Sequence, residues 1–462
     1  MIASVAVREL LREWRLWVGS FVVIAATAAI LSAVISQFAT AAALTEDQSD
    51  SLLSMTRGML VFTLLAGVAV ASSTTNLAVA SGRRGYALLQ IAGVLPRQVT
   101  AIVATQLVIL ALFATALGLG GGVLAARPLL GLASQEAELP GLTVVFDLKT
   151  VLWSAAVMIG VVLLSGARGA FRAGTVPPVE ALRDAEPAKI KMGVARWIAA
   201  GVAALFVIVF SVALSTTSQA ASFSGEDPNR AMAISGVVGL GQLLAIALTA
   251  FVAALAPMIY PLVLRSWTAC IPVGLSTSWF LARRGGKYRI TLSSAAVTPL
   301  MVGIALTGSL YTLFLTVGGA MAREGRPSWE INHASIFTLL GPALFLAALG
   351  AAAVIFMTNR TRTRDNALVE VSGGTSATLG FMAILETIIY VGTALIIGAL
   401  VFGVIGLAAS GALTQMIGQV APVFGVGVAL VVAASGILLI GIATVIPTFT
   451  GHRRTIPAAL SS

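Results

Sequence analysis

The polar side chains that could carry out chemistry in this chain are few and scattered. His333 and His452 have no Cys or carboxylate partners at ligand spacing, so they do not predict a metal site. Cys270 is the single cysteine and cannot form an internal disulfide. No Ser, His and Asp arrangement falls on one helix face. We therefore expect no catalytic residues and no metal or cofactor bound by this chain.

One carboxylate falls well inside an apolar stretch, and this is Glu386. Intramembrane carboxylates are candidates for proton or substrate handling. Glu386 lies only about two helical turns from the end of its stretch. Its mate in the internal repeat described below is the uncharged Gln106. We therefore expect a structural or coupling contact at this position rather than a proton relay.

The chain has no loop of the type that cradles ATP phosphates. Gly285-Gly286-Lys287-Tyr288 comes nearest to the pattern G-x-x-x-x-G-K-[ST], and it lacks the hydroxyl residue that holds magnesium. We therefore expect that this chain is not an ATPase. Any ATP and Mg²⁺ that drive it must be bound by another polypeptide.

Composition places these residues in a membrane protein. Apolar residues make up 58% of the 462 residues, charged residues make up 10%, and the mean hydropathy is +0.99. Apolar runs of spanning length recur along the whole chain. This predicts an all-α polytopic membrane protein of about ten helices: 17–38, 58–80, 99–126, 147–166, 197–215, 231–264, 291–318, 334–357, 379–408 and 421–447.

The distribution of charge predicts the orientation. Six short segments hold most of the 28 Lys and Arg residues but fewer than half of the 18 Asp and Glu residues. They are 1–16, 81–98, 167–196, 265–290, 358–378 and 448–462. Because basic residues favour the inner side of a membrane, we expect a multi-pass protein of the plasma (cytoplasmic) membrane with both termini cytoplasmic. The net charge of +10 is spread over these segments, which does not favour nucleic-acid binding.

An internal repeat divides the chain into groups of four, two and four spans. Arg84-Gly85-Tyr86-Ala87-Leu88 and Arg364-Asp365-Asn366-Ala367-Leu368 lie 280 positions apart, and each leads into a long apolar run. The same offset places Gln106 on Glu386 and Gly118 on Gly398. We expect a first four-helix half, two linking helices and a second four-helix half over 1–183, 184–278 and 279–462.

The segment 81–98 predicts a short helix between two spans. Gly93 is a suitable helix stop, and Pro96 suits the start of the next helix. The segment is either a solvated basic loop or a coupling helix that docks into a soluble partner, and the repeat favours the second. The candidate coupling residues in the two copies are Arg83, Arg84, Ala87, Leu88, Ile91, Gly93, Arg364, Ala367, Leu368 and Gly373.

Several local patterns remain open at this stage. The Gly118–Gly122 cluster predicts either close helix packing or a flexible span end. Pro257 and Pro261 predict that the stretch 231–264 is either kinked or extended along the interface. The outer loops are too short to hold a folded domain, which favours a substrate that arrives through the bilayer or along its outer surface.

The order of these motifs resembles the FtsX-like permeases of ABC transporters, which include the MacB-type exporters. The resemblance rests on Arg83-Arg84, Ala87-Leu88-Leu89, Gly93, Arg97-Gln98-Val99, Gln106, the glycine cluster, and Pro178-Val179-Glu180-Ala181-Leu182-Arg183. The second half departs from the pattern, because Gly374-Thr375-Ser376 replaces the region of Leu95-Pro96-Arg97. Its tail is also shorter, with Pro457-Ala458-Ala459-Leu460 at the end.

The resemblance implies a permease subunit that works with a separate ABC ATPase. Since both halves lie in one chain, we expect two ATPase subunits for each permease. The implied activity is export or extraction of an amphipathic, peptide or lipid-like substrate by mechanotransmission, in contact with membrane lipids. The alternatives are a signalling or scaffold protein that passes ATPase motion outward and an ion-driven secondary transporter.

Overall fold

The structure is a computed structural model that describes residues 2–136, 142–174, 193–223, 227–272, 274, 276–288, 290–323 and 333–451. Within these ranges all regular structure is helical and there is no strand. This confirms the predicted all-α fold class. The segments 178–183 and 457–460 and the residue His452 lie outside the described residues.

The helices follow the predicted order of elements. The first part of the chain forms α1 (Ile2–Arg12), α2 (Trp14–Ala41), α3 (Glu46–Ser81), α4 (Arg83–Ile91), α5 (Pro96–Glu136) and α6 (Leu148–Gly174). The middle part forms α8 (Val194–Phe223), α9 (Asp227–Ala254) and α10 (Ala256–Ala269). The last part forms α11 (Thr277–Tyr288), α12 (Ile290–Arg323), α13 (His333–Val371), α14 (Ser376–Ile417) and α15 (Val426–Gly451).

Nine helices in the described part of the chain are long and apolar enough to cross a membrane. They coincide with nine of the ten predicted stretches. The tenth prediction falls on α15, whose apolar part Val426–Ile442 is shorter than a full span in the residues searched. The chain is therefore a polytopic integral membrane protein.

The helices cluster into two compact units that do not follow chain order. Unit 1 holds Met1–Ala188, Phe337–Ile384 and Leu439–Ser462, and unit 2 holds Lys189–Ile336 and Leu385–Leu438. Most of α13 thus belongs with α2 and α3: Val23, Val70 and Ala353 form one buried cluster. The division into groups of four, two and four helices is a division of the sequence and remains a prediction.

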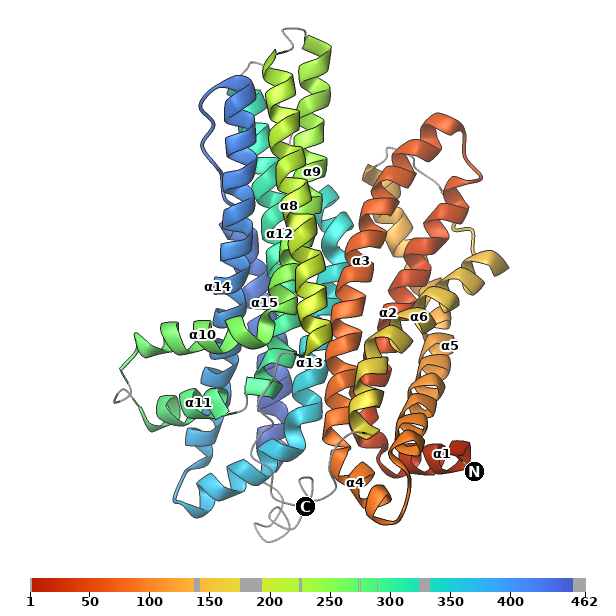
Figure 1. Cartoon of the computed structure of the whole chain (residues 1–462), viewed down its shortest axis with the longest axis vertical. Helices are drawn as coiled ribbons and strands as arrows, with labels where there is room; N and C mark the ends of the chain where they lie inside the picture. Colours follow the sequence, from red (N-terminus) through yellow and green to blue (C-terminus); the bar gives the residue numbers. More distant parts are fainter. Residues whose placement is uncertain are drawn as a thin grey trace. The chain divides into compact units, whose positions relative to one another are not determined.

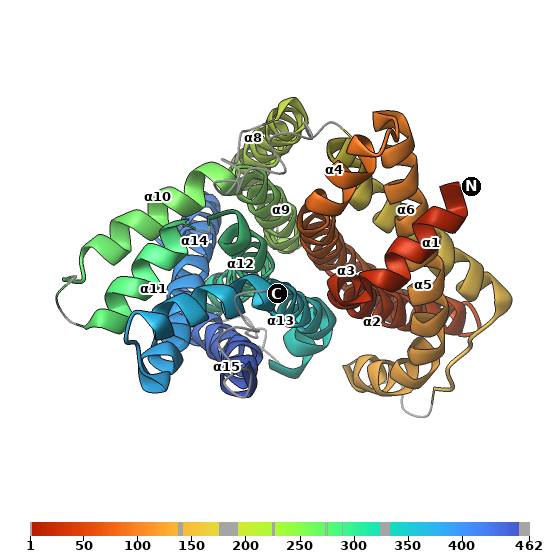
Figure 2. The same cartoon turned by 90° about the horizontal axis from the view of Figure 1, so that it is seen from below.

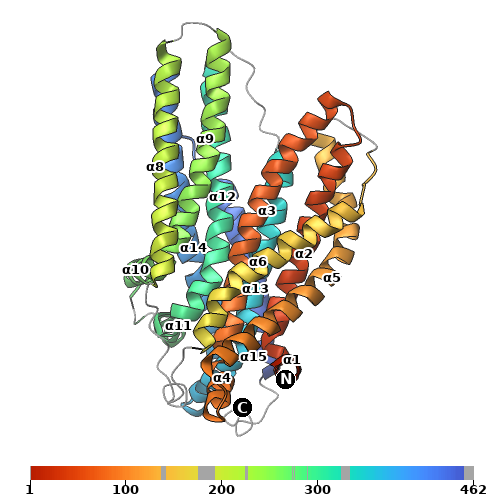
Figure 3. The same cartoon turned by 45° about the vertical axis from the view of Figure 1, so that its right-hand side comes forward.

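Within unit 1, the helices α2, α3, α5 and α6 form a bundle. Figure 3 shows α1 and α4 together at the end of this bundle where the N-terminus lies. Figure 2 shows α1 running across the ends of the long helices rather than along them. The two short basic helices of the first half therefore lie at the same end of the unit.

The stretch predicted as one span over 231–264 consists of two helices. α9 ends at Ala254, and α10 begins at Ala256 with Pro257 in its first turn. Proline is tolerated there because the first N–H groups of a helix have no intrahelical partner. Within unit 2, α10 and α11 run across the direction of α8, α9 and α14 (Figure 1). The stretch is therefore a span followed by a crosswise helix, not a single kinked span.

Two glycines of the repeat allow matching close contacts between helices. A methyl group on Gly118 of α5 would overlap the carbonyl oxygen of Ala25 on α2. A methyl group on Gly398 of α14 would lie 2.7 Å from the Ile304 side chain and 3.4 Å from the Ala305 nitrogen on α12. Ala25 and Ala305 are themselves 280 positions apart. Small residues let helix backbones approach in a membrane, where dispersion contacts drive packing. The packing interpretation of the glycine cluster is therefore confirmed at Gly118.

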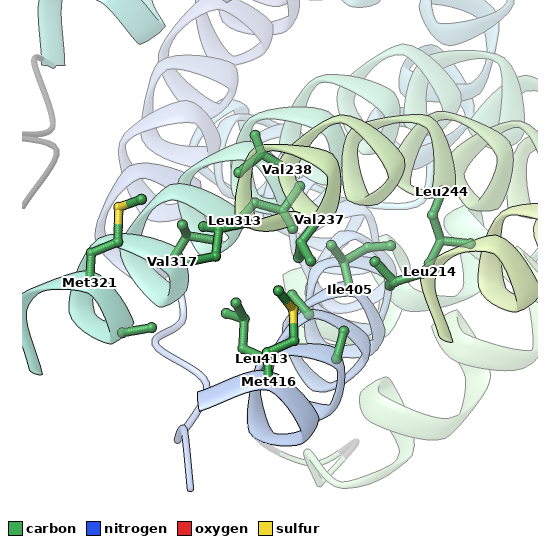
Figure 4. Close-up of a cluster of buried hydrophobic side chains, with 14 of the residues drawn as sticks. Leu214, Val237, Val238, Leu244, Leu313, Val317, Met321, Ile405, Leu413 and Met416 are labelled. Atoms are coloured by element: carbon green, nitrogen blue, oxygen red, sulfur yellow. The ribbon is translucent and has the colours of Figure 1, made fainter. Parts of the chain in front are cut away.

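The core of unit 2 gathers side chains from four helices at one end of the unit. It combines Leu214 of α8, Val237 of α9, Leu313 of α12 and Leu413 of α14, which are at most 3% exposed. Figure 4 shows these side chains pointing toward one another. The two linking helices are thus packed onto the second half, although α8 keeps most of its surface open, as a lipid-facing helix does.

Candidate coupling surface and the buried network behind it

The segment between α3 and α5 folds as the sequence predicts. α4 ends at Ile91, and Gly93 adopts a left-handed conformation with φ of +94°. The N–H groups of Gly93 and Val94 donate to the carbonyls of Gln90 and Leu89, each at 3.0 Å. This is the closing turn for which glycine is favoured, because a side chain is strained at positive φ. The predicted short helix, its stop at Gly93 and the restart at Pro96 are confirmed.

The second copy forms the same turn. Gly373 has φ of +92°, and the N–H groups of Gly373 and Gly374 donate to the carbonyls of Glu370 and Val369, each at 2.9 Å. Every donor and acceptor lies 280 positions after its counterpart in the first copy. The difference lies before the turn, since here the helix is the unbroken end of α13, whereas α4 is separated from α3 at Gly82.

In each copy a side-chain hydrogen bond caps the start of the following span. The two copies use different bonds of the same capping motif. In the first copy the N–H of Leu95 donates to Oε1 of Gln98 at 3.0 Å. In the second copy the N–H of Thr378 donates to Oγ1 of Thr375 at 3.3 Å. A full capping box contains both bonds, one from each end of a four-residue stretch. The sequence departure at 374–376 thus preserves the turn.

Each turn presents exposed apolar side chains. Leu88 is 52% exposed and Ile91 is 54% exposed, while in the second copy Leu368 is 52% exposed and Val371 is 63% exposed. Ala87 is only 1% exposed and faces the interior of unit 1. The side chains of Arg83, Arg84, Arg364 and Ala367 lie outside the described part of the structure. The coupling role of all these residues remains a prediction.

A buried hydrogen-bond network ties α4 to the rest of unit 1. The Tyr86 hydroxyl donates to Oε1 of Gln106 at 3.3 Å, and Nε2 of Gln106 donates to the Ala6 carbonyl at 3.4 Å. Gln106 is 1% exposed and Tyr86 is 6% exposed. A second bond runs from Nε2 of Gln90 to the Gly174 carbonyl at the end of α6. α4 is therefore connected to α1, α5 and α6.

Tyr86 is the side chain of α4 that binds Gln106. Burial raises the pKa of its hydroxyl well above the usual range, and the nearby carboxylates of Glu13 and Glu9 raise it further. The hydroxyl therefore stays protonated and remains a donor at physiological pH. Sequence reasoning singled out Gln106 but missed Tyr86, because the pairing depends on how α4 folds back against α5.

Glu386 occupies the place of Gln106 in the second copy. It is 3% exposed and accepts a hydrogen bond from the Tyr390 hydroxyl, one turn farther along α14. A buried polar group in a membrane span needs such a partner. Its functional role remains a prediction.

A second contact that sequence reasoning missed holds α10 to α14. Nε1 of Trp267 donates to Oγ1 of Thr393 at 3.0 Å. Gly392 leaves room for the indole, since a methyl group there would lie 3.3 Å from the ring. A tryptophan near a span end is a common interfacial anchor, but the sequence alone does not indicate its partner.

Comparison with known proteins finds a family match over part of the chain. Residues 57–178, from within α3 to just beyond α6, match the family model of the FtsX-like permease C-terminal domain. The match confirms the resemblance drawn from the motifs around Arg84 and Gly93. Proteins of this family are permease subunits of ABC transporters and normally work with a separate ABC ATPase. No curated protein matches the chain.

Proposed function

We propose that this chain is the transmembrane subunit of an ABC transporter and that a separate ATPase grips it at two places. The two places are the turns after α4 and at the end of α13. The observation that carries the proposal is the repeated turn, with Leu88 and Leu368 exposed to the same extent at positions 280 apart. Two turns with equivalent exposed apolar side chains suit two equivalent binding clefts, one on each ATPase subunit. This supports two ATPase subunits for each permease.

In this proposal the ATPase subunits bind ATP and Mg²⁺, and the turns lie on the cytoplasmic side of the plasma membrane with both termini. Closure of the ATPases on ATP would push on α4. The bonds from Tyr86 to Gln106 and from Gln90 to Gly174 would carry the push to α1, α5 and α6. Such a network is stiff because its members are buried or partly buried and are paired. Rigid-body movement of helices would then act on an amphipathic, peptide or lipid-like substrate at the outer side by mechanotransmission.

The decisive experiment is co-purification of the full-length chain with its ATPase. Leu88→Asp and Leu368→Asp each place a charge at the centre of one proposed contact. We expect each variant to reduce ATPase binding at least about tenfold, since an unpaired charge in an apolar contact costs more than about 1.4 kcal/mol. Charge reversal of Arg83 and Arg84 to Glu should also weaken binding at the first turn.

Leu148→Asp is the matched control. Leu148 is 72% exposed at the start of α6, at the far end of the α5 and α6 helices from α4. It should leave ATPase binding unchanged. Binding that survives both Leu88→Asp and Leu368→Asp would show that the turns are not the contact. Transport that persists without any ATPase would contradict the proposed class of transporter.

A further inference from the structure

The helix α1 sorts its side chains into distinct faces. Ala6 is fully buried, and its carbonyl accepts the bond from Gln106. Glu9 and Glu13 are partly buried on the same side, where their carboxylates act on Tyr86 of α4. Leu10 completes this inward face. Glu9 of α1 and Glu13, which directly follows the helix, are therefore turned toward the protein.

The outward part of α1 is apolar and basic. Val7 is 39% exposed, Leu11 is 66% exposed, and Trp14, at the start of α2, is 54% exposed. Val7 and Leu11 lie one turn apart on α1, and Trp14 follows them where α2 begins. Arg8 and Arg12 are also exposed, and they lie one turn apart beside Val7 and Leu11. The exposed face thus combines apolar side chains with two cations.

The position of α1 in the fold places this exposed face at a membrane surface. α1 runs across the end of the unit 1 bundle and leads directly into the span of α2 (Figure 2). A crosswise helix at the end of a span lies at the level of the lipid headgroups. There, tryptophan is favoured, and arginine reaches the phosphate layer while its stem stays against apolar surface.

We propose that α1 binds anionic phospholipids through this face. Val7, Leu11 and Trp14 lie at the boundary between headgroups and acyl chains, and Arg8 and Arg12 contact the lipid phosphates. Charge complementarity selects an anionic lipid over a zwitterionic one, because Glu9 and Glu13 face the other way. This inference concerns a lipid partner of the permease and does not depend on the proposed ATPase contact.

The test uses Trp14 as a reporter in the full-length protein. The protein is placed in phosphatidylcholine nanodiscs that contain a small, equal fraction of either brominated phosphatidylglycerol or brominated phosphatidylcholine. Bromine quenches tryptophan on contact, and the Trp14 signal is the difference between the wild type and Trp14→Phe. We expect brominated phosphatidylglycerol to quench Trp14 at least about fivefold more effectively, since each of the two basic residues near an anionic surface contributes on the order of 1 kcal/mol.

The paired arginine variants decide whether the site is specific. Arg8→Gln with Arg12→Gln should remove the preference for the anionic lipid. Arg97→Gln with Arg284→Gln lowers the net charge equally at other exposed positions, and should keep it. Equal quenching by the two lipids in the wild type would overturn the proposal. So would loss of the preference in both double variants, which indicates a general charge effect, or an absence of quenching by either lipid, which indicates that a protein covers α1.

Discussion

Gly93 and Gly373, 280 positions apart, hold the same left-handed conformation, with φ of +94° and +92°. Each glycine ends a helix, and the same pair of backbone hydrogen bonds closes the turn in both copies, although the residues that follow differ. The shared property of the two copies is therefore a backbone geometry. Glycine is required for it in both, because a side chain at this φ meets its own backbone.

Replacing either glycine by alanine should strain its turn. We expect Gly93→Ala and Gly373→Ala each to destabilise the turn by about 1–2 kcal/mol, the cost of a left-handed conformation for a residue with a side chain. A lower thermal unfolding temperature of the purified protein would measure this. Gly131→Ala is the control, because Gly131 is helical with no atom within 4 Å of an added methyl group. An equal loss in the control would contradict the role of φ.

The close contact between α2 and α5 predicts that replacing Gly118 destabilises the protein for a different reason. A methyl group on Gly118 overlaps the backbone of α2 at Ala25, and a backbone cannot rotate out of the way. Gly118→Ala should therefore separate the helices and cost about 1–3 kcal/mol. Gly398→Ala should cost less, because the Ile304 side chain can shift. Thermal unfolding would rank them, with Gly120→Ala, which meets no neighbour, as the neutral case.

The sequence predicts the local elements of this protein better than their partners. Apolar periodicity and length identify the spans, and Gly93 with Pro96 marks the end of one helix and the start of the next. The pairing of Tyr86 with Gln106 was not predictable, because it depends on how two helices fold against each other. Pro257 predicts a break in the stretch 231–264 but not the crosswise direction of α10.

The second copy shows a further limit of sequence patterns. The replacement at 374–376 removes the family pattern, yet the turn at Gly373 is unchanged, because Thr375 caps the span in place of Gln98. Two different residue sets thus each satisfy one of the unpaired N–H groups of the helix start, and the group differs between the copies. A comparison of residue types therefore underestimates the similarity of the two copies.

Tyr86 predicts a specific dependence of stability on pH. The pKa of its hydroxyl is raised in the folded protein by burial and by Glu13 and Glu9, whereas in the unfolded chain the hydroxyl ionises near its usual pKa of 10.0. The stabilisation by protonated Tyr86 is thus complete below about pH 10 and is lost as the pH rises further. Near neutral pH, Tyr86→Phe should cost about 1 kcal/mol through its lost hydrogen bond.

The comparison of the two proteins over pH is the measurement. Above about pH 10 the wild type should lose stability faster than Tyr86→Phe, so that the difference between their unfolding free energies shrinks and then reverses sign. Chemical unfolding at a series of alkaline pH values would follow this difference. A difference that stays constant through this range would mean that Tyr86 is not buried as the structure places it.

The contact of Trp267 with Thr393 predicts how firmly α10 is held, and the chain carries a reporter for it. Cys270 is the single cysteine, is exposed, and directly follows α10. A nitroxide label on Cys270 senses the mobility of this helix end. Thr393→Val keeps the shape but removes the acceptor of the Trp267 bond, leaving a partly buried donor unpaired at a cost of about 1 kcal/mol. Trp267→Ala removes the indole as well. We expect the mobility seen in the spectrum to increase in the order wild type, Thr393→Val, Trp267→Ala.

Trp197→Ala, at a half-exposed tryptophan of α8, is the control and should leave the spectrum unchanged. If all four proteins gave one line shape, α10 would be held by contacts other than this hydrogen bond and indole, and the anchoring role of Trp267 would be rejected.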